Sequence, residues 1–558
     1  MKAKKISSFI LHPSSFSAAA PSRAVFFTAS ALVYTAAIVS ATLTLNPYFS
    51  QTWDVNTFIH AARTLSDGRP FDLYAQTRAA QTWPYAYPPL HAFVVALALF
   101  IGDLTRVLPD YVWARAPVIA ADIGVALVLF RIVLQKSNDE TIARAAALVW
   151  LFNPITFYDT AAQGHFESAW LVFVLLAYVW FEDARPIALP ALALALAVLF
   201  KQTALVFAIP LWIEILKAEI RRMKDEGKFS FHPSSFILHL FLFAIIIGAV
   251  CLPFLLYSDD FGYMNLTYVE NVPVQTSSWI IALLGLTRAA PDALTSDFFL
   301  LRYQTSVTLL AAVVVAFVAA RRGWSLYLAA TLIAIAFFLT SKKVMGYYYV
   351  MLLPFLLAEI LPRRRFDLAS ITIVATSYIA LAPYYAAWTN HMHWWVYAAL
   401  GTTNSLFFVW LFWQTTADRR SPTADPSTPL PSAIAQDSAQ DAAVCRLRSA
   451  VMIALGLFTA ATIAAWLQPL LPNNGSPIRA PLVAPGMETI ALLMFAALIG
   501  LVVLALSVVR VLARLTDARA LIAAGSIVLI FAPLFFSVYT LTKESTAILE
   551  IALKMLGV

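Results

Sequence analysis

The chain has few charged residues and very little cysteine. Charged residues make up 12% of it, whereas hydrophobic residues make up 61% and the mean hydropathy is +0.76. A soluble domain carries roughly a quarter charged residues, so most of this chain is expected to lie in a bilayer. The two cysteines, Cys251 in an apolar run and Cys445 in a polar segment, predict neither a disulfide nor a metal site built on thiolates.

Motifs of nucleotide-dependent and soluble enzymes are also missing. The sequence contains no GxGxxG, P-loop, nucleophile elbow or HExxH pattern, so chemistry on soluble nucleotides and ATP-driven transport have no support in it. The net charge of +7 comes from short basic clusters between apolar runs. That distribution is the positive-inside pattern of a membrane protein, and no nucleic-acid partner is expected.

The recurring apolar runs predict an all-α polytopic membrane protein with about 14–15 transmembrane helices. The first run, about 24–45, is long enough to remain as an anchor, and the basic residues before it place the N-terminus in the cytoplasm. Residues 88–102 are apolar but short. If they crossed the membrane, most of the later basic clusters would lie outside, so we expect an interfacial or re-entrant helix there.

These spans divide the chain into four parts. We expect a cytoplasmic N-terminus at 1–23, a transmembrane catalytic body at 24–415 with a large external loop at 46–110, a flexible cytoplasmic linker at 416–446, and C-terminal transmembrane helices at 447–558.

The external loop carries a carboxylate, Asp54, followed by His60 and Arg63. Such an Asp is usually a solvated residue near a helix start. The alternative is a general base at the membrane surface, because transfer of a sugar from a lipid phosphate needs only one base to activate the acceptor hydroxyl. Aromatic residues of the same loop, Tyr87 among them, are suited to packing against sugar rings.

Three lysines are expected on the external side of the membrane, where the positive-inside tendency disfavours positive charge. Lys201 interrupts a long apolar stretch, and Lys342 and Lys343 lie between two later spans. Lys201 is either a side chain that snorkels to the interface or the partner of an anionic phosphate. For the pair, contact with lipid headgroups and binding of a donor phosphate are both open, and the tyrosines at 347–349 that follow are expected to form an interfacial belt.

A fourth polar group consists of Asp159, Gln163, His165 and Glu167 at the external end of a span, where it predicts a polar pocket. Asp122 lies within a neighbouring span and is expected to pair with Arg115, Lys201 or another loop cation. No spacing names a metal. We therefore expect no cofactor, although the sequence leaves a divalent metal open.

These motifs, in order, resemble the GT-C superfamily of glycosyltransferases that use polyprenyl-phosphate sugars, and most closely the dolichyl-phosphate-glucose glucosyltransferases of N-glycan assembly. The resemblance covers about residues 46–210. The matching positions are Asp54 with His60, the run from Tyr87 through Pro88 and Pro89 to Phe93, Asp122, Gly164 to Glu167, and Phe200 to Gln202.

The resemblance implies an inverting glycosyltransferase that moves a hexose from a polyprenyl-phosphate sugar to a lipid-linked glycan, glycolipid, polymer or protein on the external face. Asp54 would be the catalytic base, and Asp122, Pro88 and Pro89 would support the site. The residues expected to bind the substrate or the donor phosphate are Lys201, Gln202, Lys342, Lys343, His165, Glu167, Tyr87, His60 and Arg63. Membrane lipids would surround the protein, and no obligatory metal is implied.

We place the protein in the plasma membrane, while sequons at Asn265 and Asn474 leave the endoplasmic reticulum open. Two other functions compete with the enzyme. A multispan transporter or a flippase for lipid or polysaccharide would account for the number of spans, but would place ionisable residues near the midplane. A noncatalytic scaffold that retains the fold is the third possibility, because Asn56 and the Ser341–Lys343 triplet depart from the family pattern.

Overall fold

The computed structural model describes residues 22–49, 53–79, 84–226, 235–272, 274–287, 298–381 and 394–417. This part of the chain is helical apart from loops and one isolated parallel bridge between Gln275 and Lys343. The expected linker beyond residue 417 and the C-terminal helices lie outside the described residues.

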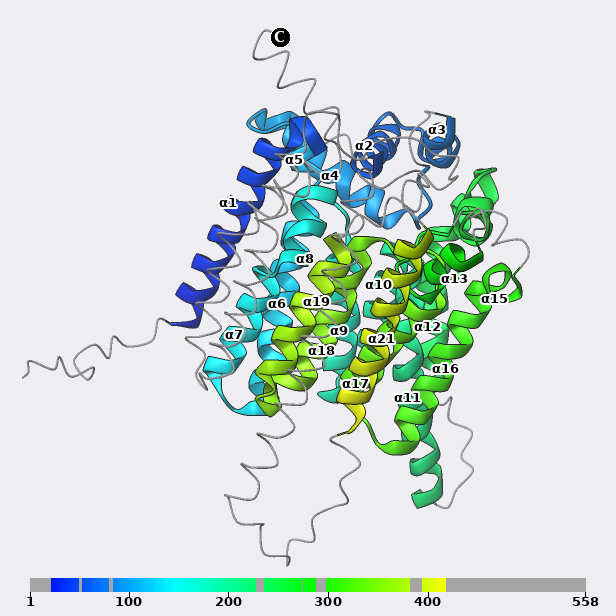
Figure 1. The fold of residues 1–558 in the computed structure, drawn as a ribbon. Helices are drawn as coiled ribbons and strands as arrows, with labels where there is room; N and C mark the ends of the chain where they lie inside the picture. The colour runs from blue at the N-terminus through cyan, green and yellow to red at the C-terminus, as the bar shows by residue number, and fades with distance from the viewer. Residues whose placement is uncertain are drawn as a thin grey trace, which may run out of the picture.

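Helices of 8 to 27 residues run side by side through the body of the molecule (Figure 1). They are α1 (Arg23–Phe49), α6 (Ala116–Ser137), α7 (Glu140–Leu151), α9 (Glu167–Glu182), α10 (Ala188–Phe200), α11 (Leu205–Glu226), α12 (Ser235–Tyr257), α16 (Gln304–Arg322), α17 (Leu326–Thr340), α18 (Leu353–Ile360), α19 (Phe366–Leu381) and α21 (Trp394–Ala417). Within the described residues, four helical stretches are long and apolar enough to cross a membrane, namely Arg23–Leu43, Asp110–Ser137, Ser235–Tyr257 and Gln304–Arg322. The protein is an all-helical polytopic membrane protein, which confirms the predicted all-α polytopic class, whereas the expected number of about 14–15 transmembrane helices is not confirmed.

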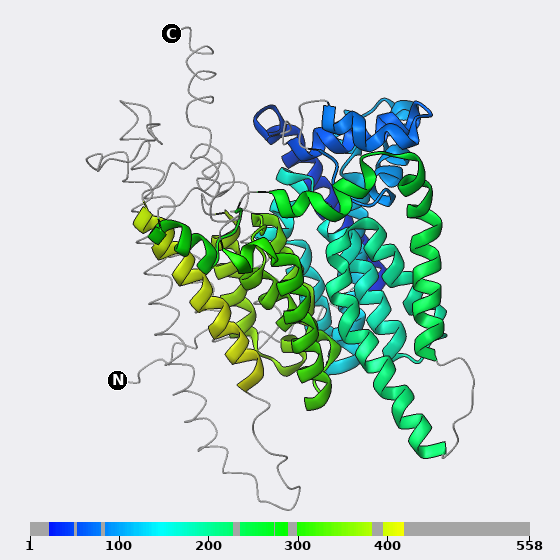
Figure 2. The same ribbon diagram turned by 90° about the vertical axis from the view of Figure 1, so that its right-hand side faces the viewer.

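Short helices of the first loop cover one end of this bundle in both ribbon views (Figures 1 and 2). They are α2 (Trp53–Ser66), α3 (Leu73–Ala79), α4 (Leu90–Thr105) and α5 (Asp110–Trp113). The 16 residues of α4 would extend about 24 Å, less than the ~30 Å of a hydrocarbon core. Its length agrees with the expected interfacial or re-entrant helix at 88–102, which stays a prediction. We call this end the loop end.

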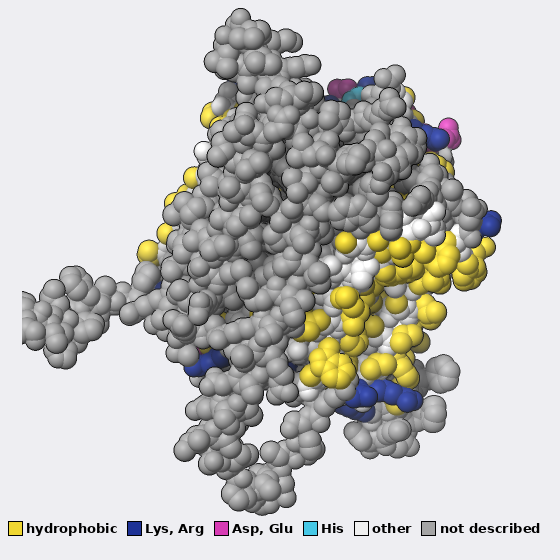
Figure 3. Space-filling view, viewed as in Figure 1, with side chains coloured by type: hydrophobic (Ala, Val, Ile, Leu, Met, Phe, Trp, Pro, Cys, Tyr) yellow, Lys and Arg dark blue, Asp and Glu magenta, His cyan; other side chains and the backbone are white. Residues whose placement is uncertain are grey.

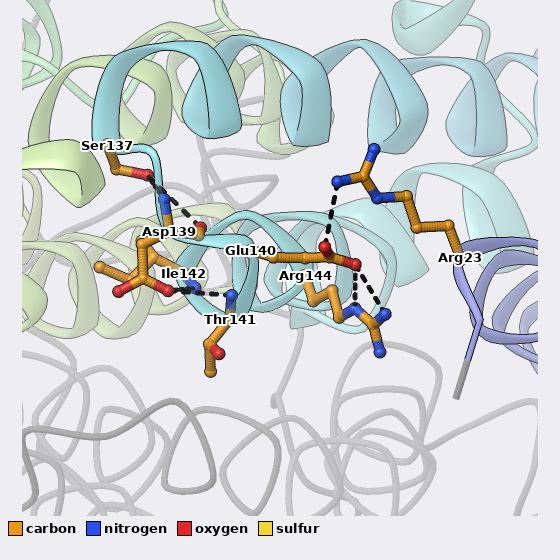
Figure 4. A network of polar contacts seen from close by, with 7 residues as sticks. All are labelled: Arg23, Ser137, Asp139, Glu140, Thr141, Ile142 and Arg144. Atoms are coloured by element: carbon orange, nitrogen blue, oxygen red, sulfur yellow. Dashed lines mark hydrogen bonds and ion pairs between the residues drawn. The ribbon is translucent and has the colours of Figure 1, made fainter. Parts of the chain in front are cut away.

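The opposite end gathers basic residues on short connections, and we call it the basic end. Glu140 accepts hydrogen bonds from Arg23 (3.0 Å) and from Arg144 (2.7 Å), which ties the start of α1 to α7 (Figure 4). Asp139 caps α7 by accepting from the backbone N–H of Thr141, and it also pairs with Arg364 at 3.2 Å. The basic clusters around these residues therefore meet at the end where α1 begins.

Candidate functional site

The centre of the site is a buried ion pair between Lys201 and Glu167. Lys201 stands in extended backbone at the break after α10, and Glu167 is the first residue of α9. Because α9 and α10 pack side by side and run in opposite directions, the end of one meets the start of the other. The Lys201 ammonium contacts the Glu167 carboxylate, and both side chains are 2% exposed or less. Lys201 therefore pairs with Glu167, a partner that the sequence analysis did not name for it.

Glu167 is held from two further sides. Its Oε2 accepts a hydrogen bond from Trp170 Nε1 at 2.5 Å, and His165 Nδ1 lies 3.3 Å from its Oε1. The other ring nitrogen of His165, Nε2, lies 3.2 Å from the Tyr87 hydroxyl. Burial, and after it the charge of Lys201, lowers the pKa of His165, so its imidazole is neutral near pH 7.

Aromatic rings surround the ammonium group of Lys201. Its Nζ lies 4.2 Å from the centroid of the Tyr348 ring and 5.4 Å from that of Tyr87. Tyr347 stacks on His165 with 3.9 Å between the ring centroids. The prediction that the tyrosines at 347–349 form an interfacial belt is wrong. They belong to η7 (Gly346–Leu352), which packs against α9, α17 and α19, and all three are buried.

Asp54 and Lys343 lie close enough for the charge of Asp54 to affect the pKa of Lys343. Asp54 lies in the first turn of α2. Burial lowers the pKa of Lys343 to about 8, while the negative charge of Asp54 acts in the opposite direction. The Lys343 ammonium also lies 5.6 Å from the centroid of the Tyr268 ring. The fold thus brings Asp54, Lys343, Tyr87, His165, Glu167 and Lys201 together at the loop end.

Two of the expected site residues are used elsewhere. Arg63 donates to Asp103 at 2.5 Å and to Asp110 at 2.9 Å, so it ties α2 to α4 and α5. Lys342 donates from Nζ to the Glu270 carbonyl at 2.6 Å, and its own carbonyl accepts from the backbone N–H of Gln275 at 2.7 Å. His60 is partly buried on α2, and its Nε2 has no hydrogen-bond partner among the described residues.

The run that contains Pro88 and Pro89 shapes one side of the site. Gln202 donates to the Ala86 carbonyl at 3.0 Å, and the Tyr85 hydroxyl donates to the Pro88 carbonyl at 3.0 Å. Pro89 stands at the cap position of α4. Gln202 and both prolines therefore fix the course of the chain around Tyr87.

Asp122 does not pair with a cation, contrary to expectation. Its carboxylate accepts hydrogen bonds from the hydroxyls of Tyr34 (2.6 Å), Thr160 (2.7 Å) and Ser168. Arg115, the proposed partner, instead donates to the backbone carbonyls of Thr160 and Tyr111. Asp122 joins α1, α6 and α9 behind the site, because hydroxyl donors satisfy its oxygens at close range.

Asp159 lies in the π-helical turn η3 (Tyr158–Gln163) and is fully buried. Neither of its carboxylate oxygens has a hydrogen-bond partner among the described residues. An ionised carboxylate without a partner is costly in such a place, so the protonated form is favoured. Across the described part of the chain, no group of three or more His, Cys, Asp or Glu side chains could hold a metal ion.

Several site residues could not be found from the sequence. Trp170 and Tyr268 follow no motif, and they reach the charged groups only through the packing of α9 and of the loop before α13 (Trp279–Thr287). Tyr348 was noticed as part of an aromatic run but was assigned to the membrane interface. Its location next to Lys201 depends on the inward course of η7.

Comparison with known proteins gives one family match. Residues 31–283 match the family model of PIG-U, described as a GPI transamidase subunit. The match covers less than half of the chain. It extends from α1 to α13 and includes Asp54, Tyr87, His165, Glu167 and Lys201. No curated protein matches.

Among solved structures, the chain is similar to ArnT from Cupriavidus metallidurans, both in the apo state and bound to undecaprenyl phosphate. In each case the identity is 16% and the TM-score 0.39, over 79% of this chain and 76% of the other.

The PIG-U match overturns the functional assignment made from the motifs. The family that the model recognises is a subunit of a transamidase, so the assignment to the GT-C glycosyltransferases, with hexose transfer as the activity, is wrong. The short motifs misled because they mark a buried cluster at the loop end, which a non-transferring protein can also keep. The polyprenyl-phosphate sugar donor has no support from the match.

Proposed function

We propose that this protein is a PIG-U-type membrane subunit that holds the headgroup of a glycosylphosphatidylinositol lipid for a transamidase assembled around it. The observation that carries the proposal is the position of the charged cluster. Asp54, Tyr87, His165, Glu167 and Lys201 all lie inside the segment that matches the PIG-U model. They converge at the loop end, where the headgroup of a membrane lipid would be presented.

The chemistry of the cluster suits a glycolipid headgroup. Tyrosine rings offer flat apolar faces to sugar C–H groups while their hydroxyls remain able to hydrogen-bond. Lys343 supplies positive charge for a phosphate, and Asp54 accepts hydrogen bonds from sugar hydroxyls. The buried Lys201–Glu167 pair stays internal and contacts His165 and Tyr348. Binding through these groups requires no bond to be broken by this chain, so the transamidation itself belongs to a partner subunit.

The noncatalytic scaffold considered from the sequence is the alternative closest to this proposal. Under it, the roles of His60 and Arg63 are to hold α2 in place, while Gln202, Pro88 and Pro89 support Tyr87. We also place the protein in the endoplasmic reticulum membrane with the loop end in the lumen, in place of the plasma membrane expected from the sequence. A sequon at Asn265, in η5 (Tyr263–Thr267) near the loop end, agrees with that side.

Copurification tests the proposal. The full chain would be expressed in cells that make glycosylphosphatidylinositol, purified in mild detergent, and examined by mass spectrometry for bound lipid and for transamidase subunits. We expect glycosylphosphatidylinositol precursors and partner subunits with the wild type. The Asp54→Asn and Lys343→Gln variants should lose the lipid and keep the partners.

A matched control is Arg131→Gln, which removes an exposed arginine that pairs with Asp183 far along α6 from the cluster. It should retain the lipid. A wild-type protein that folds but carries neither the lipid nor any transamidase subunit would disprove the proposal.

A further inference from the structure

The basic end has two halves that differ in how their charges are balanced. On the side of α1 and α7, Arg23 and Arg144 share Glu140 (Figure 4), and Arg364 pairs with Asp139. On the side of α11 and α16, Arg321 and Arg322 form no ion pair within the described part of the chain. Both side chains are exposed. Lys217 and Arg222 of α11 pair with Glu214 and Glu219, so within the described residues of this half the uncompensated positive charge lies at the end of α16.

The unneutralised arginines stand at the foot of an apolar stripe. Leu310, Val313, Val314 and Phe317 follow one face of α16 at helical spacing and are 44–64% exposed. Arg321 is the next residue on that face, and its guanidinium carbon lies 4.7 Å from the centroid of the Phe317 ring. Figure 3 shows dark-blue side chains directly below an apolar surface at the lower right, where Figure 1 places α11 and α16.

The end of α16 is held in place by its neighbours. Lys217 of α11 donates to the Ala320 carbonyl at 2.7 Å, and Gly323 ends the helix with φ +65°. The guanidinium carbon of Arg322 lies 5.9 Å from the Trp324 ring centroid. Aromatic rings therefore orient both arginines without neutralising them, so their charge and their hydrogen-bond donors stay available to an external anion.

We propose that α16 and its terminal arginines bind one anionic phospholipid of the leaflet at the basic end. The acyl chains would cover the stripe from Leu310 to Phe317, and Arg321 and Arg322 would hold the headgroup phosphate. Charge complementarity selects this occupant, because a zwitterionic lipid would leave the arginine charges unbalanced. Each basic side chain near a phosphate is worth about 1 kcal/mol, or about fivefold in affinity.

A simpler explanation is that the arginines only offset the partial negative charge at the C-terminus of α16. The two explanations differ in a measurable way. If the arginines only offset the helix dipole, replacing them changes the stability of α16 and leaves lipid binding unchanged. If they form a lipid site, the protein binds phosphatidylglycerol in preference to phosphatidylcholine.

Native mass spectrometry of the full chain from mixed micelles tests this. The wild type should retain phosphatidylglycerol in preference to phosphatidylcholine, and Arg321→Gln with Arg322→Gln should lower its apparent affinity for phosphatidylglycerol on the order of tenfold. Arg23→Gln with Arg364→Gln removes two charges from the neutralised half and should change the affinity less than about twofold. Arg321→Lys with Arg322→Lys, which keeps the charge, should retain most of the binding.

Three results would overturn the proposal. They are an unchanged affinity in the Arg321/Arg322 glutamine variant, an equal loss in both glutamine variants, and displacement of the lipid by millimolar inorganic phosphate. The last would show a site for a free anion to which the apolar stripe contributes nothing.

Discussion

At the scale of single residues, the site depends on buried charges that satisfy one another. Lys201 and Glu167 are almost fully removed from solvent, and each has the other as its counter-charge. Desolvation of such a pair offsets much of its attraction, so the pair adds little to stability as a whole. Loss of one partner lowers the stability of the protein strongly, because it leaves an uncompensated buried charge.

Glu167→Gln should therefore destabilise the protein by about 3–5 kcal/mol, whereas adding Lys201→Met to it should recover most of the loss. Thermal unfolding of the single and double variants in the same detergent would measure both effects. Additive losses in the double variant would contradict a direct interaction. Glu140→Gln, which removes a carboxylate from exposed pairs at the basic end, should lower the midpoint of thermal unfolding far less than Glu167→Gln.

Lys343 should titrate close to neutral pH. Burial lowers its pKa to about 8 in the folded protein, whereas an unfolded lysine titrates near 10.5. Between these values the unfolded chain binds more protons than the folded one, so this residue makes stability rise with pH from about 8 upward. Any anion bound through the charge of Lys343 should be released as the pH rises through about 8.

Side-chain nitrogen NMR of labelled lysine, assigned with Lys343→Gln, would give the midpoint directly. A titration midpoint above pH 10 would mean that the Lys343 ammonium is solvated and that burial does not lower its pKa. The same variant should remove the dependence of stability on pH between 8 and 10.

At the scale of elements, the position of α2 decides whether Asp54 reaches the cluster. Its Arg63 holds α4 and α5, and its Val55 packs on Gly164, the residue that ends η3. Gly164 has φ +59°, and a Cβ there would lie 2.5 Å from Val55 Cγ2 and 3.0 Å from the guanidinium carbon of Arg115. Both the backbone conformation and the close packing therefore require glycine.

Gly164→Ala should lower stability by about 2–4 kcal/mol, because it combines backbone strain with overpacking. Gly68→Ala is the matched control, since Gly68 also has a positive φ, +75°, but nothing within 4 Å of its would-be Cβ. It should cost only about 1 kcal/mol. Equal shifts in the midpoint of thermal unfolding would show that packing against α2 contributes nothing.

At the scale of the whole molecule, the two ends of the bundle differ in chemistry. The loop end holds the charged cluster under α2 to α5, and the basic end holds the arginine-rich connections. From the positive-inside tendency we expect the basic end to lie in the cytoplasm and the loop end outside or in a lumen.

Cysteine labelling would test this orientation in a Cys251→Ser, Cys445→Ser background. Leu266→Cys, at an exposed position near the loop end, should react with an impermeant maleimide only from the outside of intact cells or the lumen of vesicles. Arg185→Cys, exposed between α9 and α10 at the basic end, should react only from the cytoplasmic side. The opposite pattern would invert the topology and remove the proposed lumenal site.

Much of the fold could be predicted from the sequence, because hydropathy and charge act locally. The shortness of the run at 88–102 and the placement of basic clusters predict an interfacial or re-entrant helix, and the structure has the 16-residue helix α4 there. The cluster itself was only partly predictable. His165, Glu167 and Lys201 were recognised as unusual, since ionisable groups in apolar surroundings stand out in a sequence. Their mutual contacts were not recognised, and neither were the different positions of Lys342 and Lys343.

The sequence by itself determined that this chain is a helical membrane protein with a polar loop end, because solubility in a bilayer is a property of each segment. The tertiary structure alone decided which charges meet. Lys201 pairs with Glu167 and Asp122 with three hydroxyls because packed helices bring together residues that are far apart in the chain. Contacts of that kind depend on how helices stack, and no local pattern of residues encodes them.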